Sequence, residues 1–142
     1  MELENQEILN GSAARNDGGQ QAPREKTMME IFNRYAPYLA ECRIAISSDL
    51  ANAPQGRILS EYFERGKMLR PLLVLLSASV VGGDPSQAIP AAQALEMLHG
   101  ASLIHDDIID GAKERRGRPP LHHVIGVGPA VVLGDYLILR AC

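Results

Sequence analysis

The chain has 142 residues, enough for one ordinary domain and too few for two. Hydrophobic residues make up 46% of it, which is typical of a globular protein and excludes a wholly disordered chain. A net charge of −3 favours neither nucleic acid nor an anionic membrane as a partner, and the two cysteines, Cys42 and Cys142, form no zinc-binding or disulfide pattern.

The N-terminus and the longest apolar stretch both argue against export or membrane insertion. MELENQEIL carries no basic segment followed by an apolar run, so no signal peptide is predicted. LLVLLSASVVGG is shorter than the about 20 residues that a transmembrane helix needs. Together with the isolated cysteines, these features predict a cytoplasmic protein without a transmembrane segment.

Composition divides the chain into a tail and a helical part. Residues 1–23 include NGSAARNDGGQQAP, which is rich in Gly, Asn and Gln and has no apolar period, so they are predicted to form a disordered tail. Residues 24–142 show helical patterns throughout and are predicted to form one helical unit.

The first helices are marked by proline and by apolar spacing. A helix opened by Pro23 is expected to bend or end at Pro37. Its continuation carries apolar residues at spacings of three and four, namely Leu39, Cys42, Ile46 and Leu50. A short amphipathic helix is expected after Pro54.

Two further helical segments are expected in the middle of the chain. Pro71 suits the first turn of a helix, and the pair Gly82 and Gly83 suits its end. Asp84 is expected to cap the next segment, with Pro85 at its first position.

The second of these segments is predicted to run to Asp110, with a kink near Pro90 and a stop at Gly111. A polar loop follows, and a last helix is expected from Pro129. No strand pattern appears, so the fold class is predicted to be all-α, an antiparallel helical bundle. VVLGDYLILRAC stops within an apolar helical pattern without a terminator, and the chain is therefore expected to be truncated.

The stretch SLIHDDIID concentrates three aspartates near the end of a predicted helix. Asp106 and Asp110 lie seven and eleven positions after His99, so the three residues share one narrow stripe of that helix. Its other faces are apolar, with Leu95, Met97, Leu98, Ile104, Ile108 and Ile109. A helix that is apolar nearly all round is expected to be buried, with its polar stripe facing an internal cleft.

Negative charge at this position is unfavourable unless a cation binds there. Asp106 and Asp110 repel each other by about 0.2–0.5 kcal/mol, and they lie at the negative end of the helix dipole. Ligands that offer only oxygen favour a hard cation, with Mg²⁺ the natural candidate. The DDxxD pattern by itself fits a solvated helix end equally well, so the interpretation depends on its surroundings.

Two basic clusters supply those surroundings. GKMLRP contains Lys67 and Arg70, and ERRGRP contains Arg115 and Arg116. Arginine binds phosphate through two parallel hydrogen bonds and lysine supplies a compact charge. Each cluster alone is typical of a solvated surface, and His99 alone is typical of a core histidine. Combined with the aspartates, they indicate metal-bridged diphosphate binding inside a helical bundle.

These residues also resemble a known family. GKMLRPLLVLL, LEMLHGASLIHDDIIDGAKERRGRPPLHH and VVLGDYLILRA, from about Gly66 to the end of the chain, are similar to the trans-isoprenyl diphosphate synthases, or polyprenyl synthetases. The resemblance implies an isoprenoid-synthase-type fold surrounding a deep cavity. It also implies a prenyltransferase of isoprenoid biosynthesis that condenses isopentenyl diphosphate with an allylic diphosphate to give trans-polyprenyl diphosphates, and that is a homodimer when complete.

The resemblance assigns roles to individual residues. It makes Asp106, Asp110 and Arg115 the catalytic groups, with Asp106 and Asp110, and Asp107 beside them, as Mg²⁺ ligands for the allylic diphosphate. Arg115 contacts that same diphosphate. The resemblance implies that the diphosphate of isopentenyl diphosphate is bound by four residues, Lys67, Arg70, His99 and Arg116.

Product length is assigned to the residues before the first aspartate. Ala101 and Ser102 are small, which resembles enzymes that make geranylgeranyl or longer products. Plain helix packing is the alternative explanation of these two residues.

The sequence departs from the family pattern in two places. Arg65 stands where the family has the first glycine of a GGK motif, and no second aspartate-rich motif follows. Asp135 matches a family position but does not replace that motif. We therefore expect a fragment that is inactive alone. A non-catalytic partner subunit of a full synthase, or a class I terpene cyclase, remains an alternative, although His99 and GKMLRP argue against a cyclase.

Overall fold

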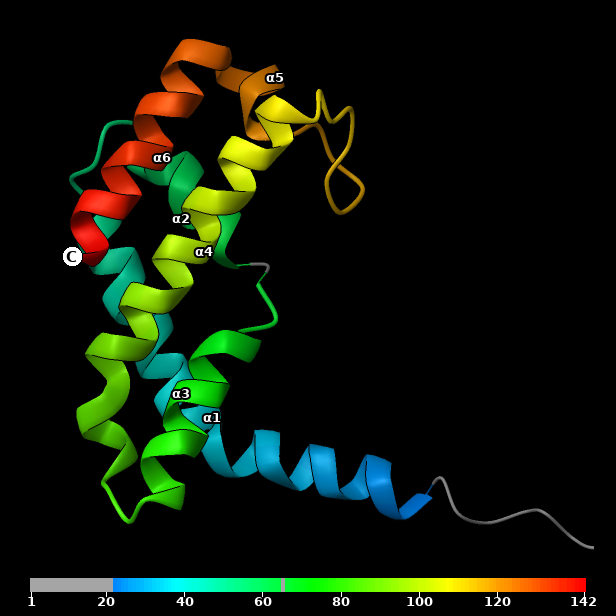
Figure 1. Ribbon diagram of the computed structural model, residues 1–142, viewed down its shortest axis with the longest axis vertical. Helices are drawn as coiled ribbons and strands as arrows, with labels where there is room; N and C mark the ends of the chain where they lie inside the picture. The colour runs from blue at the N-terminus through cyan, green and yellow to red at the C-terminus, as the bar shows by residue number, and fades with distance from the viewer. Residues whose placement is uncertain (1–21, 65) are drawn as a thin grey trace, which may run out of the picture. The chain divides into compact units, whose positions relative to one another are not determined.

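The computed structural model describes residues 22–64 and 66–142, with side chains from Thr27 onward. The described residues form helices and no β-strand, which confirms the predicted all-α class (Figure 1). The chain divides into two units, Met1–Ile31 and Phe32–Cys142, and the predicted site residues all belong to the second. The predicted tail lies outside the described residues up to position 21, and a helix begins at Ala22.

Helix α1 (Ala22–Leu50) continues through Pro37, so of the bend or end predicted at this proline, an end is excluded. The apolar period of α1 continues beyond the proline. The predicted apolar face is confirmed, because its four residues are buried: Leu39, Cys42, Ile46 and Leu50. The Tyr35 hydroxyl donates a hydrogen bond of 2.8 Å to Ser79 Oγ and so joins α1 to the third helix.

Helix α2 (Gly56–Glu64) is the short amphipathic helix that the sequence predicts, with Leu59 and Phe63 buried. The Phe63 ring lies directly against Gly100 of the later helix α4 (Ile89–Ile109). A Cβ atom at Gly100 would lie 2.4 Å from Phe63 Cζ, so the close approach of α2 to α4 requires glycine there.

Helix α3 (Leu69–Val80) carries Pro71 in its first turn, as expected. The segment after Gly83 differs from the prediction. Asp84 caps a 3-10 helix, η1 (Pro85–Ala88), by accepting a hydrogen bond from Ser86 N at 2.9 Å. Helix α4 (Ile89–Ile109) then begins, so Pro90 lies in its first turn and not at a kink. A proline in the first turn costs no backbone hydrogen bond.

Helix α4 ends at Gly111, as the sequence predicts. Gly111 has a φ of +59°, and the amides of Gly111 and Ala112 donate to the carbonyls of Ile108 and Asp107. This is the Schellman arrangement, in which a left-handed residue satisfies the last carbonyls of a helix. It turns the chain sharply after the aspartates.

Two helices complete the described chain, α5 (Leu121–Ile125) and α6 (Val127–Ala141). Sequence reasoning missed α5 and placed the start of the last helix at Pro129, which lies in the first turn of α6. Helix α6 packs on α4, where a Cβ atom at Gly134 would lie 2.2 Å from His105 Nε2. Among the described helices, none is long and apolar enough to span a bilayer.

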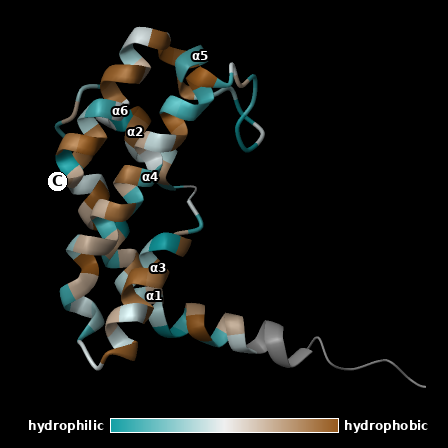
Figure 2. Cartoon of the chain, viewed as in Figure 1, coloured by the Kyte–Doolittle hydropathy of each residue, from teal (hydrophilic) through white to brown (hydrophobic). Residues whose placement is uncertain are grey.

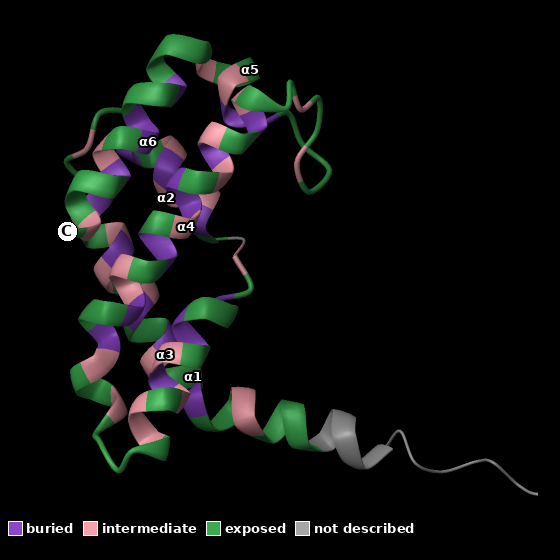
Figure 3. Ribbon diagram, viewed as in Figure 1, coloured by how far each residue is buried: buried purple, intermediate pink, exposed green. Residues whose placement is uncertain are grey.

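Helix α4 has a buried face and an exposed apolar face. Met97, Ala101 and Ile104 are buried against the other helices. Leu95, Leu98 and Ile109 are 39%, 38% and 80% exposed, so the prediction that α4 is buried all round is wrong for the described chain. Figures 2 and 3 show apolar positions of α4 that remain exposed. The helices that contact α4 cover only part of its circumference.

Candidate functional site

The three aspartates at the end of α4 have different surroundings. Asp106 and Asp110 are exposed, whereas the Asp107 side chain is only 2% exposed. Asp106 and Asp110, which were predicted to face an internal cleft together with His99, thus do not face one formed by the described residues. Asp106 and Asp110 are four positions apart on one side of the helix end, and their carboxylates reach solvent.

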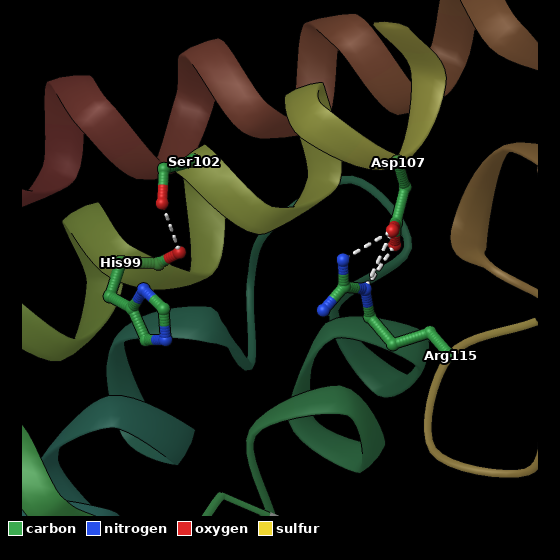
Figure 4. A network of polar contacts seen from close by, with 4 residues as sticks. All are labelled: His99, Ser102, Asp107 and Arg115. Atoms are coloured by element: carbon green, nitrogen blue, oxygen red, sulfur yellow. Dashed lines mark hydrogen bonds and ion pairs between the residues drawn. The ribbon is translucent and has the colours of Figure 1, made fainter. Parts of the chain in front are cut away.

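Asp107 is held by Arg115, which lies in the loop after α4 (Figure 4). Arg115 Nε lies 2.6 Å from each carboxylate oxygen of Asp107, and Arg115 Nη2 forms an ion pair with Oδ1. The hydrogen bond that Arg115 donates to Asp107 raises the pKa of Arg115 above its usual value. Such a pair fixes the loop against the helix end.

The described residues contain no group of three or more His, Cys, Asp or Glu side chains arranged to hold a metal ion. Because Arg115 engages Asp107, the carboxylates left for a cation are those of Asp106 and Asp110. That donor set still fits Mg²⁺, which is commonly bound by one or two carboxylates together with substrate phosphates and water.

A tight turn places the second arginine of the loop. Arg115 and Arg118 exchange backbone hydrogen bonds of 2.7 and 3.1 Å, with Arg116 and Gly117 between them. Both central residues have positive φ, +52° and +78°, which is typical of a type I′ turn. A left-handed conformation is unfavourable for arginine, so the surrounding structure holds Arg116 in place.

A cavity of about 320 Å³ lies between α2, α4 and this loop. Its wall is largely apolar, and polar side chains from all three segments enter it. They include Tyr62, Glu96, His99, Arg115 and Arg116. A concave, mostly apolar pocket with a few converging polar groups is typical of a ligand site.

His99 is the residue of the predicted aspartate stripe that lines this cavity. Burial lowers its pKa below the ordinary value of 6.5, and the charges of Arg70, Arg116 and Arg115 lower it further. The imidazole is therefore neutral at pH 7. One turn further along α4, Ser102 Oγ donates to the carbonyl oxygen of His99 at 2.8 Å (Figure 4).

Lys67 and Arg70 are exposed and do not line the cavity wall. Gly66, directly before Lys67, does line it. The structure thus brings His99, Arg115 and Arg116 together around one cavity and places Lys67 and Arg70 beside it. The charge of Arg70 still reaches the cavity, because it acts on both His99 and Glu96.

Sequence reasoning missed Glu96. Its side chain is 6% exposed, it lines the cavity, and its Oε2 has no hydrogen-bond partner among the described residues. Burial raises the pKa of Glu96 above its usual value, against the opposing charges of Arg70, Arg43 and Arg116. The available signal was an acid on an otherwise apolar stretch, LEMLH, three positions before His99.

Tyr62 Oη is a second buried polar atom on this wall without a hydrogen-bond partner among the described residues. Burial raises the pKa of Tyr62 to about 12, so its hydroxyl keeps its proton.

The remaining predicted residues lie away from the cavity wall. Ala101 is fully buried and Ser102 is exposed. Asp135 on α6 has an exposed side chain whose Oδ1 lies 3.7 Å from His105 Nε2.

Known proteins share this sequence and fold. A sequence profile of the family described as polyprenyl synthetase matches residues 55–142. The short chain isoprenyl diphosphate synthase of Methanothermobacter thermautotrophicus is 49% identical over 116 residues, which are 80% of this chain and 35% of that protein.

Solved structures of similar proteins also match the fold of this chain. Geranylgeranyl pyrophosphate synthetase from Pyrococcus horikoshii matches with a TM-score of 0.70 and 37% identity, over 81% of this chain and 36% of that one. A polyprenyl synthase from Caulobacter crescentus, crystallised with calcium and isoprenyl diphosphate, matches with a TM-score of 0.68 and 30% identity, over 78% and 35%. The chain spans about a third of the length of these relatives.

Proposed function

The chain belongs to the polyprenyl synthetase family, and from this premise we propose that it supplies part of the substrate site of a prenyltransferase. The whole protein condenses isopentenyl diphosphate with an allylic diphosphate to give trans-polyprenyl diphosphates. The proposal rests on two features of α4. Two exposed carboxylates lie at the end of the helix, and His99 of the same helix lines a cavity that Arg115 and Arg116 also line.

The spacing along α4 suits two anionic substrates. His99 and Asp106 are seven residues apart. At about 1.5 Å per residue they are separated by about 10 Å along the axis, so two diphosphates can bind without overlapping. The acidic end receives one through a cation, and the basic cavity receives the other directly.

Asp106 and Asp110 would hold Mg²⁺, which supplies charge stabilisation for the departing allylic diphosphate. Arg115 lies next to this position and is held there by Asp107, so it adds a fixed positive charge for the same group. His99, Arg116, Lys67 and Arg70 would bind the diphosphate of isopentenyl diphosphate. The apolar part of the cavity wall excludes water, which protects a reactive allylic cation from hydrolysis.

The test is an Asp106→Ala substitution in the whole protein, with labelled isopentenyl diphosphate and an allylic diphosphate as substrates. Removing one of two metal-binding carboxylates is expected to lower the Mg²⁺-dependent rate by about 100-fold or more. Glu114→Ala, at an exposed acid of the neighbouring loop, is the matched control and is expected to retain activity.

Unchanged turnover in Asp106→Ala would remove the metal assignment. A whole protein that incorporates no labelled isopentenyl diphosphate would contradict the condensation itself. It would then favour a cyclase if an allylic diphosphate is consumed alone, or a non-catalytic partner subunit if nothing is consumed.

Three further features remain predictions. The first is that Ala101 and Ser102 determine product length, the second is a homodimeric assembly, and the third is a cytoplasmic location. All three rest on the resemblance and the sequence. Mass spectrometry of the products of Ala101→Phe is the direct test of the first, because a larger side chain is expected to shorten the product.

A further inference from the structure

We propose that Glu96 is a positioning residue, whose buried carboxylate holds the arginines and the turn that bind the diphosphate of isopentenyl diphosphate. The inference rests on the proposed function and deepens it. Nothing in the family motifs of this sequence assigns a role to Glu96.

The buried position of Glu96 is unfavourable for its negative charge. A carboxylate that is 6% exposed, with one oxygen lacking a hydrogen-bond partner among the described residues, is unfavourable unless nearby positive charge compensates it. An alanine or leucine at this position of α4 would avoid that cost. A buried acid facing a ligand cavity therefore indicates a use for its charge.

Positive charges from several segments compensate the charge of Glu96. Arg70, Arg43 and Arg116 are the cations that act on Glu96. They come from three different segments, α3, α1 and the loop after α4. One carboxylate is thus within electrostatic reach of arginines from three otherwise separate segments.

Arg43 already has other partners. Its Nη1 donates to the carbonyl oxygens of Phe63 and Glu64 at 3.3 and 2.9 Å, and its Nη2 donates to that of Gly66 at 2.6 Å. Arg43 therefore fixes the turn that leads to Lys67. Arg70, which is exposed, and Arg116, which lines the cavity, are the cations that Glu96 orients toward a ligand.

Glu96 also lies close to this turn. A Cβ atom on Gly66 would lie 3.0 Å from Glu96 Oε1, so the backbone before Lys67 rests against the carboxylate. Arg43 and Glu96 hold the turn from two sides. A guanidinium has donors on more than one edge, so Arg70 and Arg116 are able to face Glu96 on one edge and a diphosphate on another.

The experiment is steady-state kinetics of Glu96→Gln in the whole protein. Glutamine keeps the size and removes the charge. We expect the KM for isopentenyl diphosphate to rise by about 10-fold, while kcat and the KM for the allylic diphosphate change by less than about threefold. Glu41→Gln, at an exposed position of α1, makes the same chemical change away from the site and is expected to match the wild type.

A second variant tests whether charge is what matters. Glu96→Asp keeps the charge on a shorter side chain and is expected to give an intermediate KM for isopentenyl diphosphate. An unchanged KM in Glu96→Gln, an equal rise of both KM values, or a KM in Glu96→Asp at or above that of Glu96→Gln would each overturn the inference. Wild-type protein without condensation activity would instead contradict the proposed function.

Discussion

Helix α4 carries two buried carboxylates in contrasting surroundings. Asp107, in its last turn, is 2% exposed, and Arg115 contacts both of its oxygens. Glu96, three turns earlier, is 6% exposed, and one of its oxygens has no hydrogen-bond partner among the described residues. Both groups are acids of the same helix, yet one is satisfied by its neighbours in the described chain and the other is not.

The difference separates a structural role from a binding role. A satisfied buried pair ties the loop at residues 111–120 to the helix end, and it leaves Asp106 and Asp110 exposed for a cation. A buried acid without a hydrogen-bond partner is tolerated where a ligand or nearby cationic side chains supply the missing interactions. The two regions should therefore respond in opposite ways when the charge is removed.

The largest effect is expected from Asp107→Asn. Removing this charge leaves Arg115 without its partner, and breaking a buried pair costs about 3–5 kcal/mol. Because Arg115 is 29% exposed, we expect the low end, about 3 kcal/mol off the free energy of unfolding, measured by urea denaturation. Asp106→Asn, one residue earlier and exposed, is the control and should change it by less than about 0.5 kcal/mol. Equal losses in the two variants would contradict the contrast.

A smaller effect of opposite sign is expected from Glu96→Gln. Neutralising a desolvated, incompletely paired acid is expected to leave the free energy of unfolding unchanged or raise it by up to about 1 kcal/mol. The measurement is the same urea denaturation at pH 7. A loss comparable to that of Asp107→Asn would show that the Glu96 charge stabilises the fold.

The pH dependence of this difference follows from the raised pKa of Glu96. Above its ordinary pKa of 4.5, the folded state holds on to a proton that the unfolded state releases, so the wild type loses stability as pH rises through the window from 4.5 up to the folded-state pKa. The variant has no such group. Its advantage should therefore be absent below pH 4.5 and grow as pH rises through that window.

The smallest effect concerns His99, which lies between the two carboxylates. Its NMR titration midpoint is expected below 6.5, because burial and three arginines disfavour the imidazolium. Asp106 acts in the opposite direction, so Asp106→Asn should lower the midpoint further. A midpoint above 6.5 in the wild type would show that the acidic end dominates at His99 and not the basic cavity.

Local chemistry explains the part of the fold that was predictable. The apolar period of α1, the amphipathic pattern of α2 and the glycine stop at Gly111 each depend on a few neighbouring residues, and each is found as expected. Asp84 also acts as a cap, although it caps the short 3-10 helix and not the long helix. Prolines were less informative. Pro37 lies within a helix, and Pro90 and Pro129 lie in first turns, because the same residue is tolerated in several positions and the surrounding contacts choose among them.

The sequence by itself determined the helical class, the grouping of acids and bases by motif, and the family to which they belong. It placed His99, Asp106 and Asp110 on one stripe because helical periodicity is a local property. Only the tertiary structure decided that Asp107 is buried while Asp106 and Asp110 are exposed, that Arg115 pairs with Asp107, and that Glu96 faces a cavity beside Arg70 and Arg116. Burial and pairing depend on residues distant in the chain, and desolvation together with those partners fixes what a carboxylate does.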